Sequence, residues 1–400
     1  MNALAERLVA ARKARGITQD VAAARLDVSR PTFIAIEKGN RRPKPEELIA
    51  LASLYETTVN ELLREGPAPP KIAPHFRSFI EGDKEDGALQ DAIAKLTSFV
   101  DDYQFLEATL GSRGTISAPD RIGKPHGSLS SFAEHCANQE RKRLGLGSHE
   151  PISFLRQTLE DVGVHIFMDG LDSRLAGLYA FVEGFGYCIL INRKHPRDRR
   201  RWTIAHEYGH FLFDRDRPGV DFIQPMQRKP ENERFADAFA ENFLMPKEGV
   251  KRRFYDILER NNDVNVGDVC RMSDHYGVSL MAMTLRLEAI SLIPKGSWDA
   301  VKGSGARVKD IREEAGLQDS EDPDSVDMFP DRYRILAVQA WAKDLITTGM
   351  FAKLLRRSAI EARELAQKLS ERIDDRNGQN EVISVRLDES IFSTRETAPA

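Results

Sequence analysis

The stretch TIAHEYGHFLF, residues 203–213, places two histidines four positions apart, with a glutamate directly after the first. Side chains four positions apart lie on one face of a helix, so His206 and His210 can direct their imidazoles at one ion with Glu207 beside them. This is the H-E-x-x-H arrangement of zinc-binding helices. Because so short a motif also arises by chance, two ordinary histidines on the surface or in the core of a helix are the alternative.

A metal site of this kind needs a further ligand from elsewhere in the chain, because a catalytic zinc takes three protein ligands and keeps a fourth position for water. The amphipathic segment NERFADAFAENFLMP offers Glu233 as the third ligand. Asp237 lies four residues further on, on the same helical face, where it can accept a hydrogen bond from the free ring nitrogen of a ligating histidine. The two segments together favour a metal site over coincidence.

Composition limits what kind of protein can carry this site. The 400 residues are 41% hydrophobic and 30% charged, which suits two to four domains with buried cores. No apolar run reaches the roughly eighteen residues that cross a bilayer, and the N-terminus lacks a secretory signal, so we expect a cytoplasmic protein without membrane contact. Cys136, Cys188 and Cys270 are odd in number and widely spaced, which argues against a disulfide framework or a thiolate zinc cage.

Basic residues concentrate at the N-terminus. Residues 1–45 hold ten Lys/Arg against four Asp/Glu, a balance of 10 - 4 = +6 in a chain of net charge -4, so a polyanion can dock there. Thr18 is expected to cap a helix over TQDVAAARL, and Ser29 to cap a second over SRPTFIAIEKG. Two short helices around a tight turn make a helix-turn-helix, and PEELIALASLY and TVNELL supply further helices to cover its core.

The chain divides again at proline- and glycine-rich stretches. GPAPPKIAPH, residues 66–75, cannot continue a helix and marks a boundary, and residues 111–130 form a second linker. Between them, residues 88–110 repeat apolar positions at alternating spacings of four and three, which predicts one long helix. We expect this seam to pack against the next domain; a dimer contact is the alternative. The seam consists of Leu89, Ile93, Leu96, Val100 and Tyr103.

A small sheet is predicted ahead of the H-E-x-x-H segment. The runs VGVHIFMD, LAGLYAFVE and GYCILIN are rich in β-branched and aromatic residues, which is typical of strands. The H-E-x-x-H segment then follows as a helix of about a dozen residues. The cluster RKHPRDRRR, residues 193–201, carries six basic residues and one acid just before it. This cluster is a contact for an acidic substrate or DNA, or a solvated loop with one or two structural arginines.

The sequence is less informative beyond Pro246. Residues 319–331 are expected to form a solvated acidic loop. The stretch DLITTGMFAKLLRRSAIEARELAQKL has the outline of a second helix-turn-helix, although a helical packing element is the favoured interpretation. A peptidase also needs a donor for the oxyanion, and His275 and Tyr276 are candidates. A packed tyrosine beside a surface histidine is favoured there, and the role stays unassigned.

The metal segments resemble a known family. RWTIAHEYGHFLF followed by ERFADAFAENFLMP resembles the ImmA/IrrE family of zinc metallopeptidases, with Trp202 in place of the usual Phe. The resemblance implies a zincin fold and one Zn²⁺ per chain, held by His206, His210 and Glu233, with Glu207 as the catalytic base. Zinc lowers the pKa of its bound water to roughly 7, and the base takes the water proton and passes it to the leaving amine.

The first 65 residues resemble the Cro/repressor-like helix-turn-helix family, often called XRE, in TQDVAAARLDVSRPTFIAIEKGNRRPKPEELIALA. In that geometry the recognition helix enters the major groove with its N-terminal residues at base edges. The candidates for base contact are Gln19, Ser29, Arg30 and Thr32. The candidates for phosphate neutralisation are Arg41, Arg42 and Lys44. A motif used only for protein contact or dimerisation is the alternative.

The sequence therefore predicts a multidomain, mainly α protein with an N-terminal all-α helix-turn-helix bundle and an α+β zincin-like domain. The expected divisions are residues 1–65 for DNA binding, 66–129 for a linker with a long helix, 130–290 for the metallopeptidase, 291–376 for a mostly helical region and 377–400 for a mobile tail or edge strand.

Two functions fit this architecture. The favoured one is a regulator that binds double-stranded DNA and carries a zinc endopeptidase. As the family resemblance implies, this enzyme would cut a helix-turn-helix repressor, in trans or within its own chain, and so control stress or mobile-element genes. The alternative is a non-proteolytic DNA-binding repressor or antitoxin-like protein whose zinc domain is a sensor or a structural module. An intact Glu207 favours the first, because a purely structural zinc needs no base beside it.

Overall fold

The structure is a computed structural model of the chain. It describes residues 3–15, 17–55, 59–63, 87–112, 122, 127–182, 185–215, 219–222, 229–317, 327–374 and 381–384. The chain forms two compact units, the first of residues 1–105 and 115–326 and the second of residues 106–114 and 327–400. The proline-rich boundary at residues 66–75 and most of the linker at 111–130 and of the acidic loop at 319–331 lie outside the described residues.

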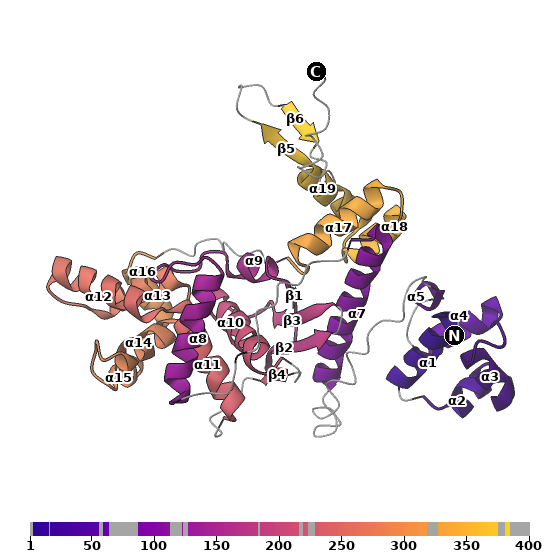
Figure 1. The fold of residues 1–400 in the computed structure, drawn as a ribbon, viewed down its shortest axis with the longest axis horizontal. Coiled ribbons are helices and arrows are strands. Elements are labelled where there is room, and N and C mark those ends of the chain that lie inside the picture. The colour runs from indigo at the N-terminus through magenta and orange to yellow at the C-terminus, as the bar shows by residue number, and fades with distance from the viewer. Residues whose placement is uncertain are drawn as a thin grey trace, which may run out of the picture. The chain divides into compact units, whose positions relative to one another are not determined.

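The N-terminal segment is an all-α bundle (Figure 1). Its helices are α1 (Ala3–Ala14), α2 (Gln19–Arg25), α3 (Arg30–Glu37), α4 (Pro45–Leu54) and α5 (Val59–Leu63). The Thr18 hydroxyl caps α2 by accepting a hydrogen bond from the Val21 amide, and the Ser29 hydroxyl caps α3 in the same way, as predicted. Asp27 takes a φ of 52° between them, which turns the chain sharply.

The centre of the chain builds a four-stranded sheet in the order β1-β3-β2-β4. Its strands are β1 (Val164–Asp169), β2 (Leu175–Val182), β3 (Gly186–Asn192) and β4 (Gly219–Phe222). β1 runs parallel to β3, whereas β2 is antiparallel to both β3 and β4. The first three strands coincide with the three predicted runs. β4 is short and was not predicted.

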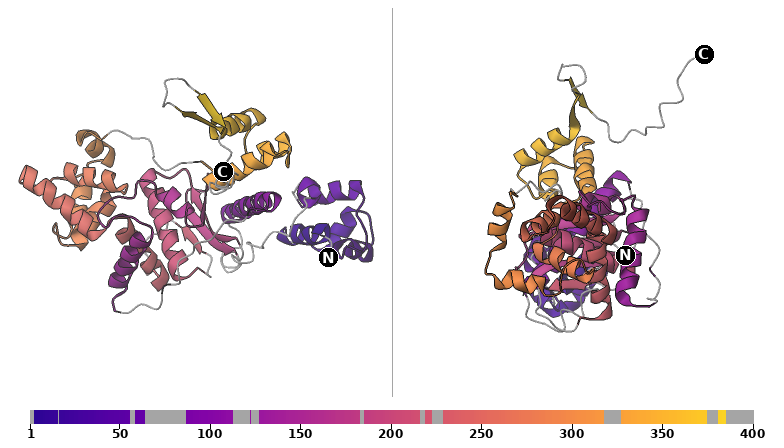
Figure 2. Two further views of the ribbon diagram at one scale, coloured as in Figure 1. Left: turned by 45° about the horizontal axis from the view of Figure 1, so that its top comes forward. Right: turned by 90° about the vertical axis from the view of Figure 1, so that its left-hand side faces the viewer.

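Helices pack on both faces of this sheet (Figures 1 and 2). Val164 and Ile166 of β1 join the apolar core that also holds Ile204 of α10 (Arg197–Phe213). The alternate residues of β1 meet α7 (Gly87–Leu110), where the Phe99 ring stacks on Phe167 at a centroid distance of 5.4 Å. The seam of α7 is buried within the chain. It therefore makes an intramolecular contact, as expected.

The first unit contains further helices besides α7, α10 and those of the N-terminal bundle. They are α8 (Leu129–Arg143), α9 (Leu155–Glu160), α11 (Glu231–Leu244), α12 (Lys247–Asn261), α13 (Val266–Tyr276), α14 (Leu280–Ala289), α15 (Ser297–Gly303) and α16 (Val308–Glu314). α11 packs on α10 along one side and on α8 along the other. This arrangement fixes α11, which carries the proposed third ligand, against the helix of the two histidines.

The basic cluster before the histidines is not a loop. α10 begins at Arg197 and has 17 residues rather than about a dozen, so its first turns include most of the cluster. Arg201 is 2% exposed and donates hydrogen bonds to the carbonyl oxygens of Ile152 and Ser153. The alternative of a solvated loop is therefore wrong for residues 197–201, because clustered arginines are as compatible with a helix as with a loop. Arg201 is the structural arginine of this cluster.

The second unit contains α17 (Asp331–Ala342), α18 (Thr348–Leu354), α19 (Ala359–Ser370) and an antiparallel pair, β5 (Glu371–Asp374) and β6 (Glu381–Ser384). Its core is aromatic: the Trp341 and Phe351 rings stack at 5.0 Å, and the Tyr333 hydroxyl donates to the carbonyl oxygen of Leu354. β6 lies in the segment expected to be a tail or edge strand. In the described part of the chain, no helix is both long and apolar enough to span a membrane.

Candidate functional site

The three candidate ligands converge between α10 and α11. The Nε2 atoms of His206 and His210 lie 3.2 Å apart, and each lies 3.4 Å from a carboxylate oxygen of Glu233. The histidines are 3% and 1% exposed, so their ring orientation is fixed by packing. Among the described residues, no other group of three His, Cys, Asp or Glu side chains gathers closely enough to share an ion.

The spacing of these atoms fits a zinc ion. Tetrahedral coordination with bonds of about 2.0–2.1 Å separates neighbouring ligand atoms by about 3.3–3.4 Å. The two imidazole nitrogens lie 3.2 Å apart, close to this separation, while Glu233 Oε2 lies 3.4 Å from His206 Nε2 and Glu233 Oε1 lies 3.4 Å from His210 Nε2. One donor atom from each of the three residues lies within 4.8 Å of the others. Two imidazoles and one carboxylate are also a donor set that zinc accepts in enzymes, with the fourth position left open.

Each imidazole uses its other nitrogen to bind a carboxylate. His206 Nδ1 lies 3.1 Å from Asp237 Oδ1, the partner that the helical spacing suggested. His210 Nδ1 lies 2.9 Å from Asp214 Oδ1, a partner that the sequence analysis missed. Asp214 also follows its histidine by four residues, but it is the C-cap residue of α10, where helical spacing no longer fixes direction. With Nδ1 engaged, both rings present Nε2 to the centre.

Two further side chains hold these carboxylates in place. The Lys229 ammonium donates to Asp237 Oδ2 at 2.7 Å, and the Asn232 amide donates to Asp214 Oδ2 at 3.0 Å. Neither residue was a candidate in the sequence analysis, because both contacts depend on how the chain returns to α11 after leaving α10. The histidine orientation is therefore supported by a second layer of hydrogen bonds.

The members of this cluster shift one another's pKa values. Burial lowers the pKa of His210, but hydrogen bonds to Asp214 and Glu233 outweigh burial and raise it to about 9. Burial raises the pKa of Glu233, whereas hydrogen bonds from both histidines lower it well below its usual range. The pKa of Asp237 is likewise lowered, against burial, by its bond to His206. The carboxylates are thus ionised at neutral pH, and their negative charge favours a cation.

Close packing of the two helices makes this convergence possible. A Cβ atom on Gly209 would lie 3.1 Å from Cα of Ala236 and 3.3 Å from Cδ1 of Phe239, closer than side chains normally approach. The sheet supports the same region from the other side. The Tyr179 ring stacks on His210 at a centroid distance of 4.9 Å. The Tyr187 hydroxyl donates to the carbonyl oxygen of Glu207 at 3.0 Å.

Glu207 is fully buried beside the candidate ligands. After burial and the hydrogen bonds named above, its negative charge also contributes to the raised pKa of His210, which places the carboxylate within electrostatic reach of that ring. Tyr276, by contrast, is packed in the core, where its hydroxyl donates to the carbonyl oxygen of His149 at 3.2 Å. His275 is half-buried on the same helix.

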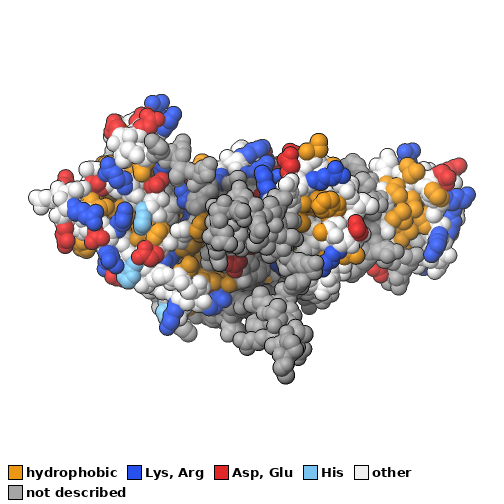
Figure 3. Space-filling view, turned by 90° about the horizontal axis from the view of Figure 1, so that it is seen from above, with side chains coloured by type: hydrophobic (Ala, Val, Ile, Leu, Met, Phe, Trp, Pro, Cys, Tyr) orange, Lys and Arg blue, Asp and Glu red, His pale blue; other side chains and the backbone are white. Residues whose placement is uncertain are grey.

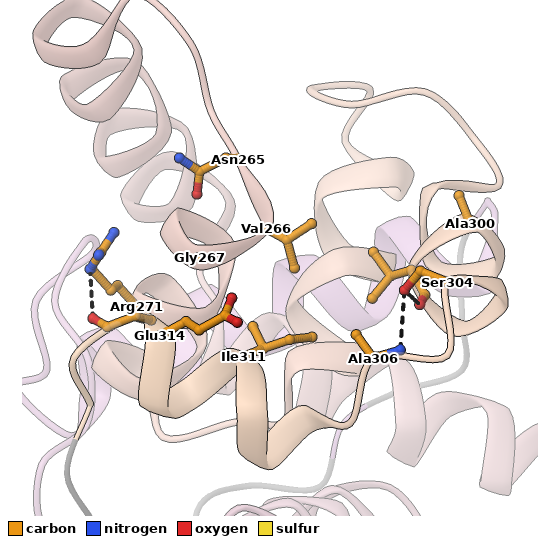
Figure 4. A pocket seen from close by; sticks show the side chains of 11 residues that line it. Asn265, Val266, Gly267, Arg271, Ala300, Ser304, Ala306, Ile311 and Glu314 are labelled. Atoms are coloured by element: carbon orange, nitrogen blue, oxygen red, sulfur yellow. Dashed lines mark hydrogen bonds between the residues drawn. The ribbon is translucent and has the colours of Figure 1, made fainter.

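A separate hollow opens between α13, α15 and α16 (Figure 4). It contains none of the candidate ligands. Arg271 at its edge donates to the carbonyl oxygen of Ala315 at 3.1 Å and lies 2.9 Å from Asp268. Arg271, the one basic side chain that lines the hollow, is therefore already paired within the fold.

The candidates for base contact differ in how they are held. Ser29 and Thr32 hydroxyls lie 2.8 Å apart at the start of α3, and Ser29 is exposed. Arg30 lies 3.4 Å from Asp20 in a pair that is mostly exposed. The Gln19 amide donates to the buried Glu37 at 2.7 Å, so part of its hydrogen-bonding capacity is used inside the bundle.

The candidates for phosphate contact differ in the same way. The Arg41 guanidinium donates to Glu47 at 2.8 Å and is half-buried. Arg42 and Lys44 are exposed. Exposed cations can approach a phosphate without breaking an internal bond, so Arg42 and Lys44 are better placed for this role than Arg41.

Comparison with family models assigns both regions. A model of the IrrE N-terminal-like domain, a peptidase family, matches residues 159–288, which include α10 and α11 with the three converging side chains. A model of a helix-turn-helix domain matches residues 3–64. The chain carries both domains. The helix-turn-helix domain and the IrrE-like domain together confirm the predicted combination and the mainly α architecture with an α+β domain.

Whole-chain comparisons add little. Comparison with curated protein sequences finds no match. Among solved structures, the crystal structure of ComR from Streptococcus suis aligns over 92% of this chain and 94% of that chain, with 15% sequence identity and a TM-score of 0.15. A TM-score this low carries no information on the fold. The assignment of the two domains therefore depends on the family models and on the geometry described above.

Proposed function

We propose that the chain is a DNA-binding regulator whose IrrE-like domain is a zinc-dependent endopeptidase. The observation that carries this proposal is the convergence of His206, His210 and Glu233, which offer one donor atom each within 4.8 Å of one another; two imidazoles and a carboxylate are a donor set of catalytic zinc. These residues would hold one Zn²⁺. When bound, the ion would supply a nucleophile at neutral pH and polarise the scissile carbonyl.

The protein's own groups would act around that centre. Glu207, buried next to the two histidines, would accept the proton of the attacking water and later deliver it to the leaving amine nitrogen. Asp214 and Asp237 would keep the Nε2 lone pairs directed at the centre through their bonds to Nδ1. An intact buried carboxylate in this place favours hydrolysis over a purely structural or sensory role.

The helix-turn-helix domain supports a substrate that is itself a regulatory protein. A peptidase tethered to a DNA-binding domain is concentrated near proteins bound at the same DNA. We therefore propose that the substrate is a helix-turn-helix repressor, either a separate protein or the N-terminal bundle of this chain. Its cleavage would release genes for stress response or for mobile elements.

The test compares zinc-loaded wild type with Glu207→Gln, each incubated with helix-turn-helix repressors encoded nearby. We expect both proteins to hold one zinc per chain by elemental analysis, and only the wild type to produce fragments by mass spectrometry. If the variant cuts as fast as the wild type, Glu207 is not the base. If the zinc-loaded wild type cuts none of them and also leaves its own chain intact, the proteolytic proposal fails and a non-proteolytic regulator remains.

A further inference from the structure

The second unit repeats the turn of the helix-turn-helix domain, position for position. In each copy a threonine caps a seven-residue helix, Thr18 for α2 and Thr347 for α18. A leucine is the C-cap residue in both, and the next residue has a positive φ, 52° at Asp27 and 53° at Arg356. Each pair of matching residues is separated by 329 positions.

The hydrogen bonds of the two turns also correspond. The hydroxyl of Ser29 accepts the Thr32 amide at 3.3 Å, and the hydroxyl of Ser358 accepts the Glu361 amide at 3.3 Å, so a serine caps the second helix in both copies. Between the helices, Val28 N donates to Ala23 O at 3.1 Å, and Arg357 N donates to Ala352 O at 3.0 Å. The two turns therefore share one backbone conformation.

Packing corresponds as well. Ala22 and Ala23 on the inner side of α2 are buried, and their counterparts Phe351 and Ala352 on α18 are buried too. Phe33 of α3 and its counterpart Ala362 of α19 are both fully buried. The smaller residue in α19 is matched by a larger one in α18, and Trp341 of the preceding helix stacks on Phe351. A three-helix core thus supports the second motif as it supports the first.

The outer face of α19 is polar and carries both charges around one large apolar side chain. Ile360 is 70% exposed, and Arg363, one turn further on, is also exposed. Residues 347–370 hold five Lys/Arg and two Asp/Glu, against four and three in the corresponding residues 18–41. The second motif is therefore the more basic of the two.

We propose that α18 and α19 form a second DNA-binding helix-turn-helix, with α19 in the major groove. In that geometry the first turns of the second helix reach base edges. Ile360 would contact a thymine methyl group and Arg363 a guanine edge, the pairings that these side chains favour. Lys353, exposed on α18, would neutralise a phosphate. β5 follows α19 directly and pairs with β6, so a β-hairpin lies next in the chain after the proposed recognition helix.

The same face fits a protein partner less well. A protein interface usually has a contiguous apolar centre, whereas the exposed residues near Ile360 in the chain are mostly polar or charged: Ser358, Glu361, Arg363 and Glu364, with Ala359 as a small apolar one. An isolated apolar side chain among hydrogen-bonding and charged groups suits a base-pair edge. DNA is therefore the partner that we commit to.

The test uses the full-length protein and a labelled pool of random-sequence DNA duplexes, with binding followed by fluorescence anisotropy at several salt concentrations. Lys353→Ala with Arg363→Ala should lower the slope of log affinity against log salt by about one, because Lys353 is the phosphate contact of the pair. The matched control, Lys295→Ala with Lys309→Ala, removes the same charge from exposed positions elsewhere and should leave the slope unchanged. Circular dichroism melting verifies that both variants are folded.

Two further measurements distinguish DNA binding by the second motif from binding by the first motif alone and from a protein contact. In a background of Arg42→Ala with Lys44→Ala, which weakens the first motif, residual salt-dependent binding should persist and should fall when Lys353 and Arg363 are also replaced. A slope equal to that of the control in both backgrounds overturns the proposal. If the Lys353 and Arg363 variant instead changes the sedimentation of the protein without DNA, while the slope stays the same, the face is a protein contact.

Discussion

At the residue scale, the candidate metal centre depends on side chains that would not touch the ion. Asp214 and Asp237 each bind the Nδ1 atom of one histidine, and each is held in turn by a neighbouring donor. Such contacts fix both the tautomer and the direction of the ring. A ring free to rotate would have to be ordered again at each binding event, which costs affinity.

Replacing Asp237 by Asn should therefore weaken zinc binding without removing a ligand. The expected loss is about 10–100-fold in affinity, because a neutral amide oxygen accepts the Nδ1–H hydrogen bond more weakly than a carboxylate does. Competition with a chromogenic chelator measures this change. Asp198→Asn is the matched control, since Asp198 lies in the first turn of α10, the helix of the two histidines, and outside the cluster. Equal affinities in the two variants would mean that Asp237 has no orienting role.

The three thiols should be inert in the folded protein. All three are buried, and burial raises the pKa of Cys136 to about 11 and that of Cys188 well above its usual range. The thiolate is the reactive form, and a pKa of about 11 leaves only about one thousandth of it at pH 8. Iodoacetamide at pH 8 should leave the native chain unmodified and alkylate three cysteines after denaturation. Rapid native labelling of Cys136 would contradict this.

At the scale of elements, the contact between α10 and α11 decides whether the ligands can meet. Gly209→Ala would gain up to about 1 kcal/mol of helix propensity. It would also press a methyl group against the backbone of Ala236, and overpacking of this kind costs about 1–3 kcal/mol. The steric cost is the larger of the two, so α11 should shift and carry Glu233 away from the histidines.

We expect Gly209→Ala to show a lower melting temperature and weaker zinc binding than the wild type. Calorimetry and chelator competition measure the two effects. Gly303→Ala, at the end of α15, is the control, because a Cβ atom there meets nothing within 4 Å. If Gly209→Ala melts no lower than the control and binds zinc as the wild type does, the close approach of the helices is not required.

A buried ion pair joins α1 to α3 in the helix-turn-helix domain. Arg12 Nε lies 2.6 Å from Glu37 Oε1, both side chains are about a tenth exposed or less, and Gln19 also donates to Glu37. Glu37→Ala should destabilise the bundle by about 3–5 kcal/mol, because it leaves a buried guanidinium without its charge partner. Hydrogen exchange of the α1 and α3 amides in the full-length chain reads out this change locally.

The control for this prediction is an exposed ion pair in the same bundle. Arg30 and Asp20 lie 3.4 Å apart with more than half of each side chain exposed, so Asp20→Ala should change stability by less than about 1 kcal/mol. Similar protection losses in Asp20→Ala and Glu37→Ala would show that burial does not set the strength of these pairs.

Features set by near neighbours in the chain were predictable from sequence. The caps at Thr18 and Ser29, the histidine pair and the Glu233–Asp237 spacing all follow from one helical turn. Features that depend on contacts between segments distant in the sequence could not be predicted. Asp214 binds His210 where α10 ends, Lys229 and Asn232 come from the approach to α11, and β4 pairs only because the chain returns to β2. The start of α10 at Arg197 was missed because clustered arginines are typical of both exposed loops and helices.

At the scale of the whole molecule, the net charge of -4 does not by itself favour a polyanion. On the face shown in Figure 3, Lys/Arg and Asp/Glu side chains are interspersed over the described residues, in keeping with a net charge of -4. Attraction to a polyanion must therefore come from local groups, such as the ten basic residues among the first 45. DNA binding by this chain should accordingly be strongly salt-dependent.

The separate cores of the two domains predict how the protein responds to loss of metal. The helix-turn-helix domain has its own apolar cluster around Leu8, Phe33 and Leu51, distinct from the cluster that contains Phe211 and Phe239 near the candidate ligands. A bound ion stabilises only the domain that binds it, by an amount that grows with its concentration relative to the dissociation constant. Chelation should therefore act on the IrrE-like domain alone.

We expect a chelator to abolish cleavage and to lower the melting transition of the IrrE-like domain by several degrees, because a ligand at 100 times its dissociation constant contributes about 2.7 kcal/mol. DNA affinity measured by anisotropy at fixed salt should stay the same, since no candidate ligand belongs to the helix-turn-helix core. Restoring zinc should reverse both losses. A chelator-induced fall in DNA affinity, also reversed by zinc, would instead mean that the metal couples the two domains and that the peptidase centre regulates DNA binding directly.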